Sequence, residues 1–210
     1  MPNPHPDNEP LFATSYFPPI AYMAALMRMP FFSIEQQDTF PKQTHRNRTV
    51  IVSAGGLMTL SVPVVRPQGT HTRTADMGIS YAERWNVIHW RALEAAYNAS
   101  PYFLYYRDEV EQILMNHYDR LIELNDTILR FLLKKLKLSG NYNYTTQYLH
   151  QASHDYRNRF DYKRPEENIA LPSYAQVFAD RMPFQPHVSV LDLLFNLGPE
   201  AREYLQKISF

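Results

Sequence analysis

Apolar and polar positions in the first third of the chain form two short apolar runs separated by one amphipathic stretch. The runs at residues 11–15 and 31–34 predict strands, and residues 20–29 place their apolar side chains on one face of a helix. Pro19 suits the first turn of that helix, where its missing N–H is not needed. A strand, a helix and a second strand in this order favour a βαβ unit with parallel strands.

In a βαβ unit the carboxyl ends of both strands lie at one edge of the sheet, and ligands of such folds bind there. Here that edge would carry the turn at residues 16–19 and the polar segment at residues 35–48. We therefore expect a ligand-binding edge built from two segments that are distant in the sequence.

The middle of the chain predicts a hairpin and then helices. β-Branched residues flank Gly55-Gly56, which is typical of a hairpin, and apolar residues then recur with helical spacing. The predicted elements are strands at residues 50–53 and 58–65, helices at residues 81–98 and 110–136, and a strand at residues 142–149. We expect the long helix to break near residues 116–119, where Asp119 could cap its second part.

The end of the chain predicts a helical tail. Ser189 precedes an apolar run at residues 190–196, and Asp192 follows it in the register of a capping box. Gly198 ends that helix, and Pro199 begins a last one that runs to about residue 208. The whole pattern predicts an α/β fold: a single domain with a βαβ opening, a small mixed sheet, several packed helices and a helical C-terminal tail.

The composition is that of a globular protein, because 45% of the 210 residues are hydrophobic and 20% are charged. Pro recurs among the first ten residues, so we interpret residues 1–10 as a flexible N-terminal arm and residues 11–210 as a single domain. No apolar run reaches roughly 18 residues and no signal-peptide pattern is present, so we expect no transmembrane segment. The absence of Cys excludes disulfides and thiolate zinc sites and is compatible with the cytoplasm, where we expect the protein.

Charge and motifs narrow the classes of function. The 21 basic and 21 acidic residues balance, which argues against a protein that binds duplex nucleic acid through counterion release. The chain has six Gly and no glycine-rich phosphate loop, Gly-x-Ser-x-Gly turn or His-Glu-x-x-His helix. We therefore predict no nucleic-acid partner, no bound cofactor and no metal.

Positive charge is concentrated just before the predicted hairpin. Lys42, His45, Arg46 and Arg48 lie within seven residues, next to Asn47. Local positive charge on a chain without net charge favours one bound anion over a field spread across the surface. Arg offers a planar fork for phosphate or carboxylate, and Lys offers a point charge. The alternative is a solvated turn, and in either case unpaired like charges could be removed without loss of folding stability.

Other polar groups also invite a chemical interpretation. His150 and His154 have the i, i+4 spacing that can hold a metal on a helix, or they are simply exposed. His89 is either a buried histidine with its hydrogen bonds satisfied or a general base at the ligand edge. The alternating charges at residues 155–159 are interpreted as a surface salt-bridge set.

A series of blocks, taken in their order along the chain, carries a family resemblance. The blocks are Ser15-Tyr16-Phe17-Pro18-Pro19-Ile20-Ala21-Tyr22, Phe40-x-Lys42-x-x-x-Arg46-Asn47-Arg48, Leu60-Ser61-Val62-Pro63-Val64, Trp85 with His89-Trp90 and Tyr97, Ser100-Pro101-Tyr102-Phe103, Asn125, and the tail at residues 191–201. Together they resemble the WbqC-like protein family over roughly residues 11–205. Pro19 departs from the pattern, because many members carry Trp there.

The resemblance implies a place in the biosynthesis of O-antigen and related surface polysaccharides, whose substrates are sugars linked to nucleotides through a pyrophosphate. The resemblance places the protein in a pathway and not in a mechanism. One hypothesis is a cytoplasmic transferase that acts on such a sugar, by acyl or aminoacyl transfer to an amino sugar. In this hypothesis His89 is the general base. The ligand-binding residues are Tyr16, Lys42, His45, Arg46, Asn47, Arg48 and Tyr102.

A second hypothesis is a non-catalytic accessory protein of the same pathway. It would use residues 42–48, which we call the basic stretch, to dock an anionic ligand or partner. A pocket that contains Lys42, Arg46 and His89 would favour the transferase. A flat basic surface, with His89 buried and hydrogen-bonded, would favour the accessory protein.

Overall fold

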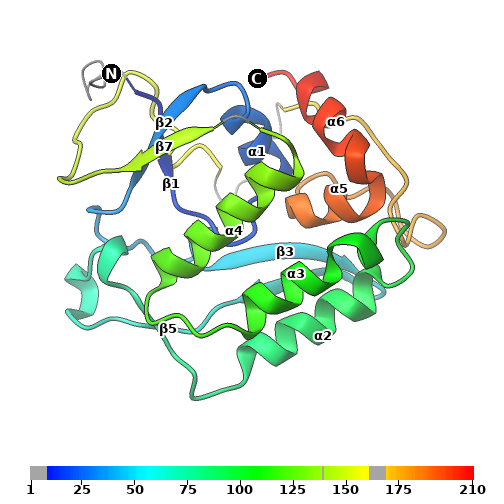
Figure 1. The fold of residues 1–210 in the computed structure, drawn as a ribbon, viewed down its shortest axis with the longest axis horizontal. Helices are drawn as coiled ribbons and strands as arrows, with labels where there is room; N and C mark the ends of the chain where they lie inside the picture. Colours follow the sequence, from blue (N-terminus) through cyan, green and yellow to red (C-terminus); the bar gives the residue numbers. More distant parts are fainter. Residues whose placement is uncertain (1–8, 139, 161–168) are drawn as a thin grey trace.

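Parallel strands open the fold, which a computed structural model describes for residues 9–138, 140–160 and 169–210 (Figure 1). Strand β1 (Leu11–Ala13), helix α1 (Ile20–Leu26) and strand β2 (Phe31–Glu35) form the predicted βαβ unit, and β1 pairs with β2 in parallel. Strand β7 (Asn141–Tyr144) joins the other side of β2, also in parallel. The strand expected at residues 142–149 therefore ends at Tyr144, after which the chain enters a loop.

The expected N-terminal arm falls mostly outside the described residues, since residues 1–8 are not among them. Its last two residues both contact β2. The carbonyl of Pro10 accepts a hydrogen bond from the N–H of Ser33 at 2.9 Å, and Glu9 accepts one from the Ser33 hydroxyl at 2.7 Å. Pro10 thus anchors the chain next to the first strand.

The predicted hairpin is present, but both of its strands begin two residues earlier than expected and the second one ends earlier. Strands β3 (Arg48–Ser53) and β4 (Gly56–Ser61) are antiparallel, and the turn between them has Gly56 at φ 108°. The chain then leaves β4 at Pro63, which has no N–H to continue the ladder. Its next residues form β5 (Val64–Val65), which pairs instead with β6 (Gly78–Ile79). Two 3₁₀ turns, Gly69–His71 and Thr74–Asp76, lie between β5 and β6.

The helices of the middle region follow the predicted pattern with two misplaced starts and one misplaced cap. They are α2 (Trp85–Tyr97), α3 (Phe103–Met115) and α4 (Leu121–Lys135), so the expected break is confirmed. The helix expected from residue 81 begins at Trp85. Helix α3 begins earlier than expected, because Leu104 and Tyr105 on its exposed face obscure the apolar periodicity. Asp119 is not the cap of α4: the N-cap is Arg120, whose N–H donates to the carboxylate of Glu123 at 3.2 Å.

The tail forms the expected pair of helices, α5 (Val190–Leu197) and α6 (Ala201–Lys207), joined by a 3₁₀ turn at Gly198–Glu200. The hydroxyl of Ser189 accepts the N–H of Leu191 and caps α5 as predicted. Asp192 does not complete a capping box. It is fully buried, and its carboxylate accepts hydrogen bonds from Tyr97 and Tyr174 at 3.0 and 2.5 Å.

Helix α1 lies at the centre of the molecule, between the parallel sheet and the helical tail (Figure 1). Every residue of α1 is buried, because the sheet covers one side and α5 and α6 cover another. Helices α2 and α3 run side by side below it. In the part of the chain that the structure describes, no helix combines the length and the apolar character needed to cross a membrane.

Candidate functional site

The carboxyl ends of β1 and β2 bring together the two segments that the βαβ pattern predicts at one edge. The N–H of Tyr16 donates to the carbonyl of His45 at 2.8 Å, and the hydroxyl of Ser15 donates to the same oxygen at 3.3 Å. A second backbone hydrogen bond holds the loop after β2 on its other side. In it, the carbonyl of Asp38 accepts the N–H of Thr74 at 2.9 Å. The basic stretch is therefore fastened to the end of β1.

A cavity of about 200 Å³ opens at this edge. Its wall comes from the end of β1, from helix α1, from the basic stretch and from a loop that follows β7. The lining residues are Ala13, Thr14, Ser15, Tyr22, Lys42, Gln43, Thr44, His45, Arg46, Tyr156, Arg157, Asn158 and Phe160. Cations and aromatic rings thus share the wall, whereas no carboxylate is among the described residues that line it.

Arg46 is buried against the cavity, with only 3% of its side chain exposed. Its Nη2 donates to Asp38 Oδ2 at 2.7 Å, and Asp38 is itself held by the Thr74 hydroxyl at 2.5 Å. The Arg46 Nε–H, by contrast, is buried and has no hydrogen-bond partner among the described residues. A buried donor without a partner is costly, so this N–H of Arg46 is a candidate to bind a ligand.

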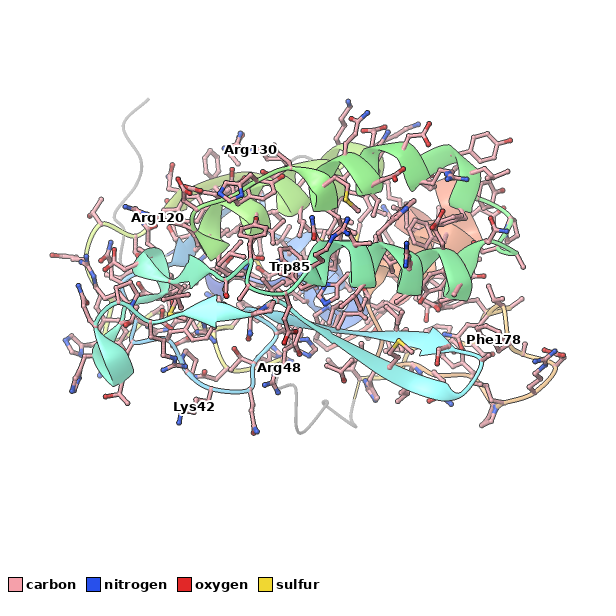
Figure 2. The ribbon with its side chains drawn as sticks, turned by 90° about the horizontal axis from the view of Figure 1, so that it is seen from below. Lys42, Arg48, Trp85, Arg120, Arg130 and Phe178 are labelled. Atoms are coloured by element: carbon pink, nitrogen blue, oxygen red, sulfur yellow. The ribbon has the colours of Figure 1, made fainter. Side chains whose placement is uncertain are left out.

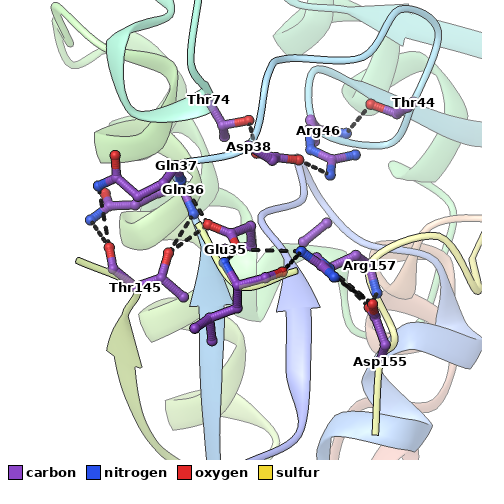
Figure 3. A network of polar contacts seen from close by, with 12 residues as sticks. Glu35, Gln36, Gln37, Asp38, Thr44, Arg46, Thr74, Thr145, Asp155 and Arg157 are labelled. Carbon is purple, nitrogen blue, oxygen red and sulfur yellow. Dashed lines mark hydrogen bonds and ion pairs between the residues drawn. The ribbon is translucent and has the colours of Figure 1, made fainter. Parts of the chain in front are cut away.

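Arg157 supplies a second buried cation from a different part of the chain. Its side chain is 7% exposed and pairs with Asp155 at 2.6 Å and with the fully buried Glu35 at 3.4 Å. Its Nη1 also donates to the carbonyl of Leu149 at 2.7 Å. Figure 3 shows this ion pair beside that of Arg46, at the ends of neighbouring strands. Both guanidinium groups are therefore held in place before any ligand binds.

The expected surface salt-bridge set is confirmed for the pair Asp155–Arg157, but the side chain of Arg157 is buried, with 7% of it exposed. Sequence reasoning missed it as a cavity residue because alternating charge is typical of a solvated segment. Its burial depends on Glu35, which is more than a hundred residues away along the chain. No local signal in the sequence connects the two.

Lys42 and the aromatic rings complete the wall. Lys42 is exposed and lies with Arg48 at the same margin of the molecule in Figure 2. Tyr156 stacks on Phe12, with ring centroids 4.7 Å apart and an interplanar angle of 7°, so its ring is held rigidly. The cavity can accommodate a ligand that has an anionic end and a flat or apolar part.

Two more members of the basic stretch have other roles in the structure. Asn47 is buried, and its amide donates to the carbonyl of Val62 at 2.9 Å, so it stabilises the start of the hairpin. Arg48 begins β3 and pairs with Ser61. The described cavity lining contains Lys42, His45 and Arg46 of the stretch, but neither Asn47 nor Arg48.

The two predicted tyrosines also lie outside the described lining of the cavity. Tyr16 is fully buried, with its hydroxyl 2.8 Å from Nδ1 of His89. The ring of Tyr102 packs against Gly198, where an added Cβ would meet it at 2.5 Å. Gly198 has a φ of 52°, so both its backbone and this close contact require Gly.

His89 is buried beneath the hairpin, 4% exposed, and is separated from the ligand edge by Tyr16. Desolvation by burial lowers its pKa to about 4, and a hydrogen bond to the backbone of Ser61 only partly opposes that effect. His89 is therefore neutral at pH 7. The position matches the description of a buried histidine with its hydrogen bonds satisfied.

The lowered pKa of His89 predicts a pH-dependent stability. The unfolded chain binds a proton near pH 6.5 that the folded chain binds only near pH 4, so stability falls as the pH drops below 6.5. Between pH 8 and pH 5.5 this group should lower the free energy of unfolding by about 1 kcal/mol. Urea denaturation at both pH values measures this difference in the free energy of unfolding. His89→Gln, which does not titrate, should show a pH dependence smaller by that amount, and an unchanged dependence would contradict the assignment.

A metal site is not formed by the two later histidines. His150 and His154 are exposed and lie in a loop, so the helical spacing that a metal would need is absent from this described segment. Across residues 9–138, 140–160 and 169–210, no cluster of three or more His, Cys, Asp or Glu side chains has the arrangement of a metal site.

Comparisons with known proteins give a family and a relative. The model of the WbqC-like protein family matches residues 14–167, a range that holds all but one of the cavity residues. The chain is also 26% identical over 222 residues to a protein of Mycobacterium tuberculosis named "Uncharacterized protein Rv1507c", covering 92% of this chain and 95% of that one. No solved structure gives a significant match.

Proposed function

The chain belongs to the WbqC-like protein family, and on that premise we propose that it is a transferase that holds a nucleotide-linked sugar by its phosphates in the cavity at the sheet edge. The proposed pathway is the biosynthesis of surface polysaccharides, to which the family resemblance points. Nucleotide-linked sugars are the activated substrates of such pathways, and the proposed function therefore belongs in the cytoplasm.

The proposal rests on the hydrogen bonding of the Arg46 guanidinium. Asp38 holds one edge of its guanidinium, while the buried Nε–H has no partner within the described part of the chain. A phosphate oxygen at this position would accept that N–H in a charge-assisted hydrogen bond. Lys42 lines the same cavity and would add positive charge around the phosphate, whereas the charge of Arg157 is already balanced by Asp155 and Glu35.

The size of the cavity limits what it encloses. At about 200 Å³ it is smaller than the pockets of roughly 300–1,000 Å³ that enclose most drug-sized ligands. A sugar ring with its phosphate is the part of a nucleotide sugar that we place inside. Tyr156 would contact the sugar ring, and the nucleoside would extend outward past the exposed Lys42.

The transfer step needs a group that accepts a proton, and His45 is the imidazole that the described cavity wall provides. An amino group of the sugar would attack the carbonyl carbon of an activated acyl donor, and its excess proton would pass to His45. The leaving group would depart with the electron pair of the broken bond. In this proposal His45 replaces His89, whose burial keeps it away from the ligand edge.

A non-catalytic accessory protein is the second candidate, favoured by the burial and hydrogen bonding of His89. It shares the anion-binding cavity but carries out no transfer. Incubation with the bound nucleotide sugar and an acyl donor, followed by mass spectrometry of the sugar, separates the two candidates. Acylated product supports the transferase, whereas an unmodified ligand that still binds supports the accessory protein.

A thermal-shift screen tests the binding that both candidates require. Nucleotide sugars and sugar 1-phosphates at about 100 times their Kd should raise the free energy of unfolding by about 2.7 kcal/mol. For a chain of this size, that corresponds to a Tm increase of roughly 5–10 °C. The same sugars without phosphate serve as controls and should leave Tm unchanged. If no phosphate-bearing ligand shifts Tm, the proposed function is wrong.

A further inference from the structure

A second and much smaller space lies next to the cavity. Its volume is about 10 Å³, and it shares Thr14, Ser15 and Tyr22 with the cavity wall. Its far side is formed by α4, which contributes Asn125 and Leu129. Such a volume is close to the least that can hold one water molecule, so the space fits a single water-sized group.

Asn125 lines this space with an amide whose orientation is set by a hydrogen bond. Its side chain is buried, with the residue 1% exposed, and its Nδ2 donates to the carbonyl of Arg46 at 2.8 Å. The orientation of the amide follows from this bond, because a carbonyl oxygen can face only the donor end of an amide. Oδ1 must then point away from Arg46.

The Oδ1 atom of Asn125 is buried, and no hydrogen-bond donor reaches it in the described part of the molecule. Buried acceptors without a partner are rare and costly, so this acceptor calls for a donor that the described residues do not supply. The space beside Asn125 is too small for more than a hydroxyl, an amino group or a water. The space therefore fits one small group that carries an N–H or O–H donor.

Two of the buried atoms that lack a partner among the described residues have opposite character and belong to adjoining parts of one site. Arg46, whose Nε is a donor, lines the cavity, and Asn125, whose Oδ1 is an acceptor, lines the small space that shares Thr14 and Ser15 with it. Arg46 and Asn125 are also joined directly, through the carbonyl of Arg46. A ligand with an anionic group and a nearby hydrogen-bond donor would satisfy both atoms.

We propose that the small space is a polar subsite in which Asn125 Oδ1 accepts a hydrogen bond from a hydroxyl or amino group of the sugar, in place of a water. The inference rests on the proposed function, because it needs a phosphate-bearing sugar in the cavity. It makes Asn125 a specificity residue that selects the position and chemistry of one substituent on the ring. Sites built to hydrogen-bond a substrate O–H or N–H discriminate strongly against analogues that lack it.

Calorimetric titration of the wild-type protein with single-position analogues tests the subsite. The probes are inorganic phosphate, glucose 1-phosphate, galactose 1-phosphate and glucosamine 1-phosphate, together with the monodeoxy forms of each sugar phosphate. We expect one monodeoxy form to bind at least tenfold more weakly than its parent. The hydroxyl and amino versions of that position then show which donor the subsite prefers.

Two variants separate the subsite from a structural role of Asn125. Asn125→Leu and Asn125→Asp both lose the bond from Nδ2 to the Arg46 carbonyl, but only Asn125→Asp keeps an acceptor oxygen. The tenfold ratio between parent and deoxy ligand should fall to within about twofold in Asn125→Leu and persist in Asn125→Asp. A purely structural role would instead weaken both ligands equally in both variants.

The outcomes of this experiment keep the two proposals apart. Equal affinities for every parent and monodeoxy pair would mean that the space holds a buried water only, which overturns the subsite and leaves the proposed function intact. If the wild type binds neither inorganic phosphate nor any sugar phosphate, the proposed function fails and the subsite fails with it. If Asn125→Leu does not fold, the titrations of the wild type and of Asn125→Asp still test the subsite.

Discussion

Arg46→Ala is expected to weaken binding of the phosphate-bearing ligand by roughly tenfold to a hundredfold. A charge-assisted hydrogen bond contributes on the order of 1.5–3 kcal/mol, and each 1.4 kcal/mol changes Kd about tenfold. Arg46 is the residue at which this should be largest, because its Nε–H is buried and lacks a partner within the described chain. Arg46→Lys should restore only part of the affinity, since Lys loses the planar fork. Calorimetric titration with the ligand that the thermal-shift screen selects measures the affinities of the wild type, Arg46→Ala and Arg46→Lys.

The same substitution should also lower folding stability, contrary to the expectation from the sequence. That expectation assumed unpaired like charges, whereas Arg46 forms a buried ion pair with Asp38, whose side chain is 13% exposed. Removing one partner of such a pair costs on the order of 3 kcal/mol, although the Thr74 hydroxyl still stabilises Asp38. Affinities should therefore be measured at a temperature at which each variant is folded.

Arg181→Ala is the matched control. Arg181 is 65% exposed, pairs with the exposed Asp180 at 3.3 Å and lies outside the described lining of the cavity. Its removal should leave the affinity unchanged and the stability within about 0.5 kcal/mol. Equal ligand affinities of wild type and Arg46→Ala would refute the assignment of the cavity as a phosphate site.

Phe195→Ala is expected to lower the free energy of unfolding by roughly 3–5 kcal/mol, because it removes a large side chain from a core that relaxes only partly. Phe195 is fully buried. Its ring centroid lies 5.1 Å from that of Phe103, edge to face, and 5.1 Å from that of Tyr97. These contacts join α5 to α2 and α3, so the substitution should loosen the attachment of the whole tail.

Urea denaturation at pH 7 measures this loss, with Phe31→Ala as the control. Phe31 begins β2 and is 46% exposed, so its truncation should cost about 1 kcal/mol or less. A loss below about 1 kcal/mol for Phe195→Ala would mean that the tail does not pack against α2 and α3 through this face.

Local patterns along the chain were sufficient to predict several elements. The order of apolar runs predicted the βαβ opening, and the Ser189 hydroxyl caps α5 as expected. These features depend on residues within a few positions of each other, where periodicity and capping rules apply directly. The meeting of residues 16–19 with the basic stretch also followed, because topology places the carboxyl ends of parallel strands at one edge.

Only the tertiary structure decided how the side chains at that edge are used. Arg46 is paired with Asp38, Arg157 is buried against Glu35, and both line a cavity that also has aromatic walls. His89, chosen from the sequence as a base, is instead buried beside Tyr16. Hydrophobic periodicity tells which face of an element is buried, but not which distant element covers it. Burial against a particular partner then determines which N–H groups of a cation bind a carboxylate and which lack a partner within the described chain.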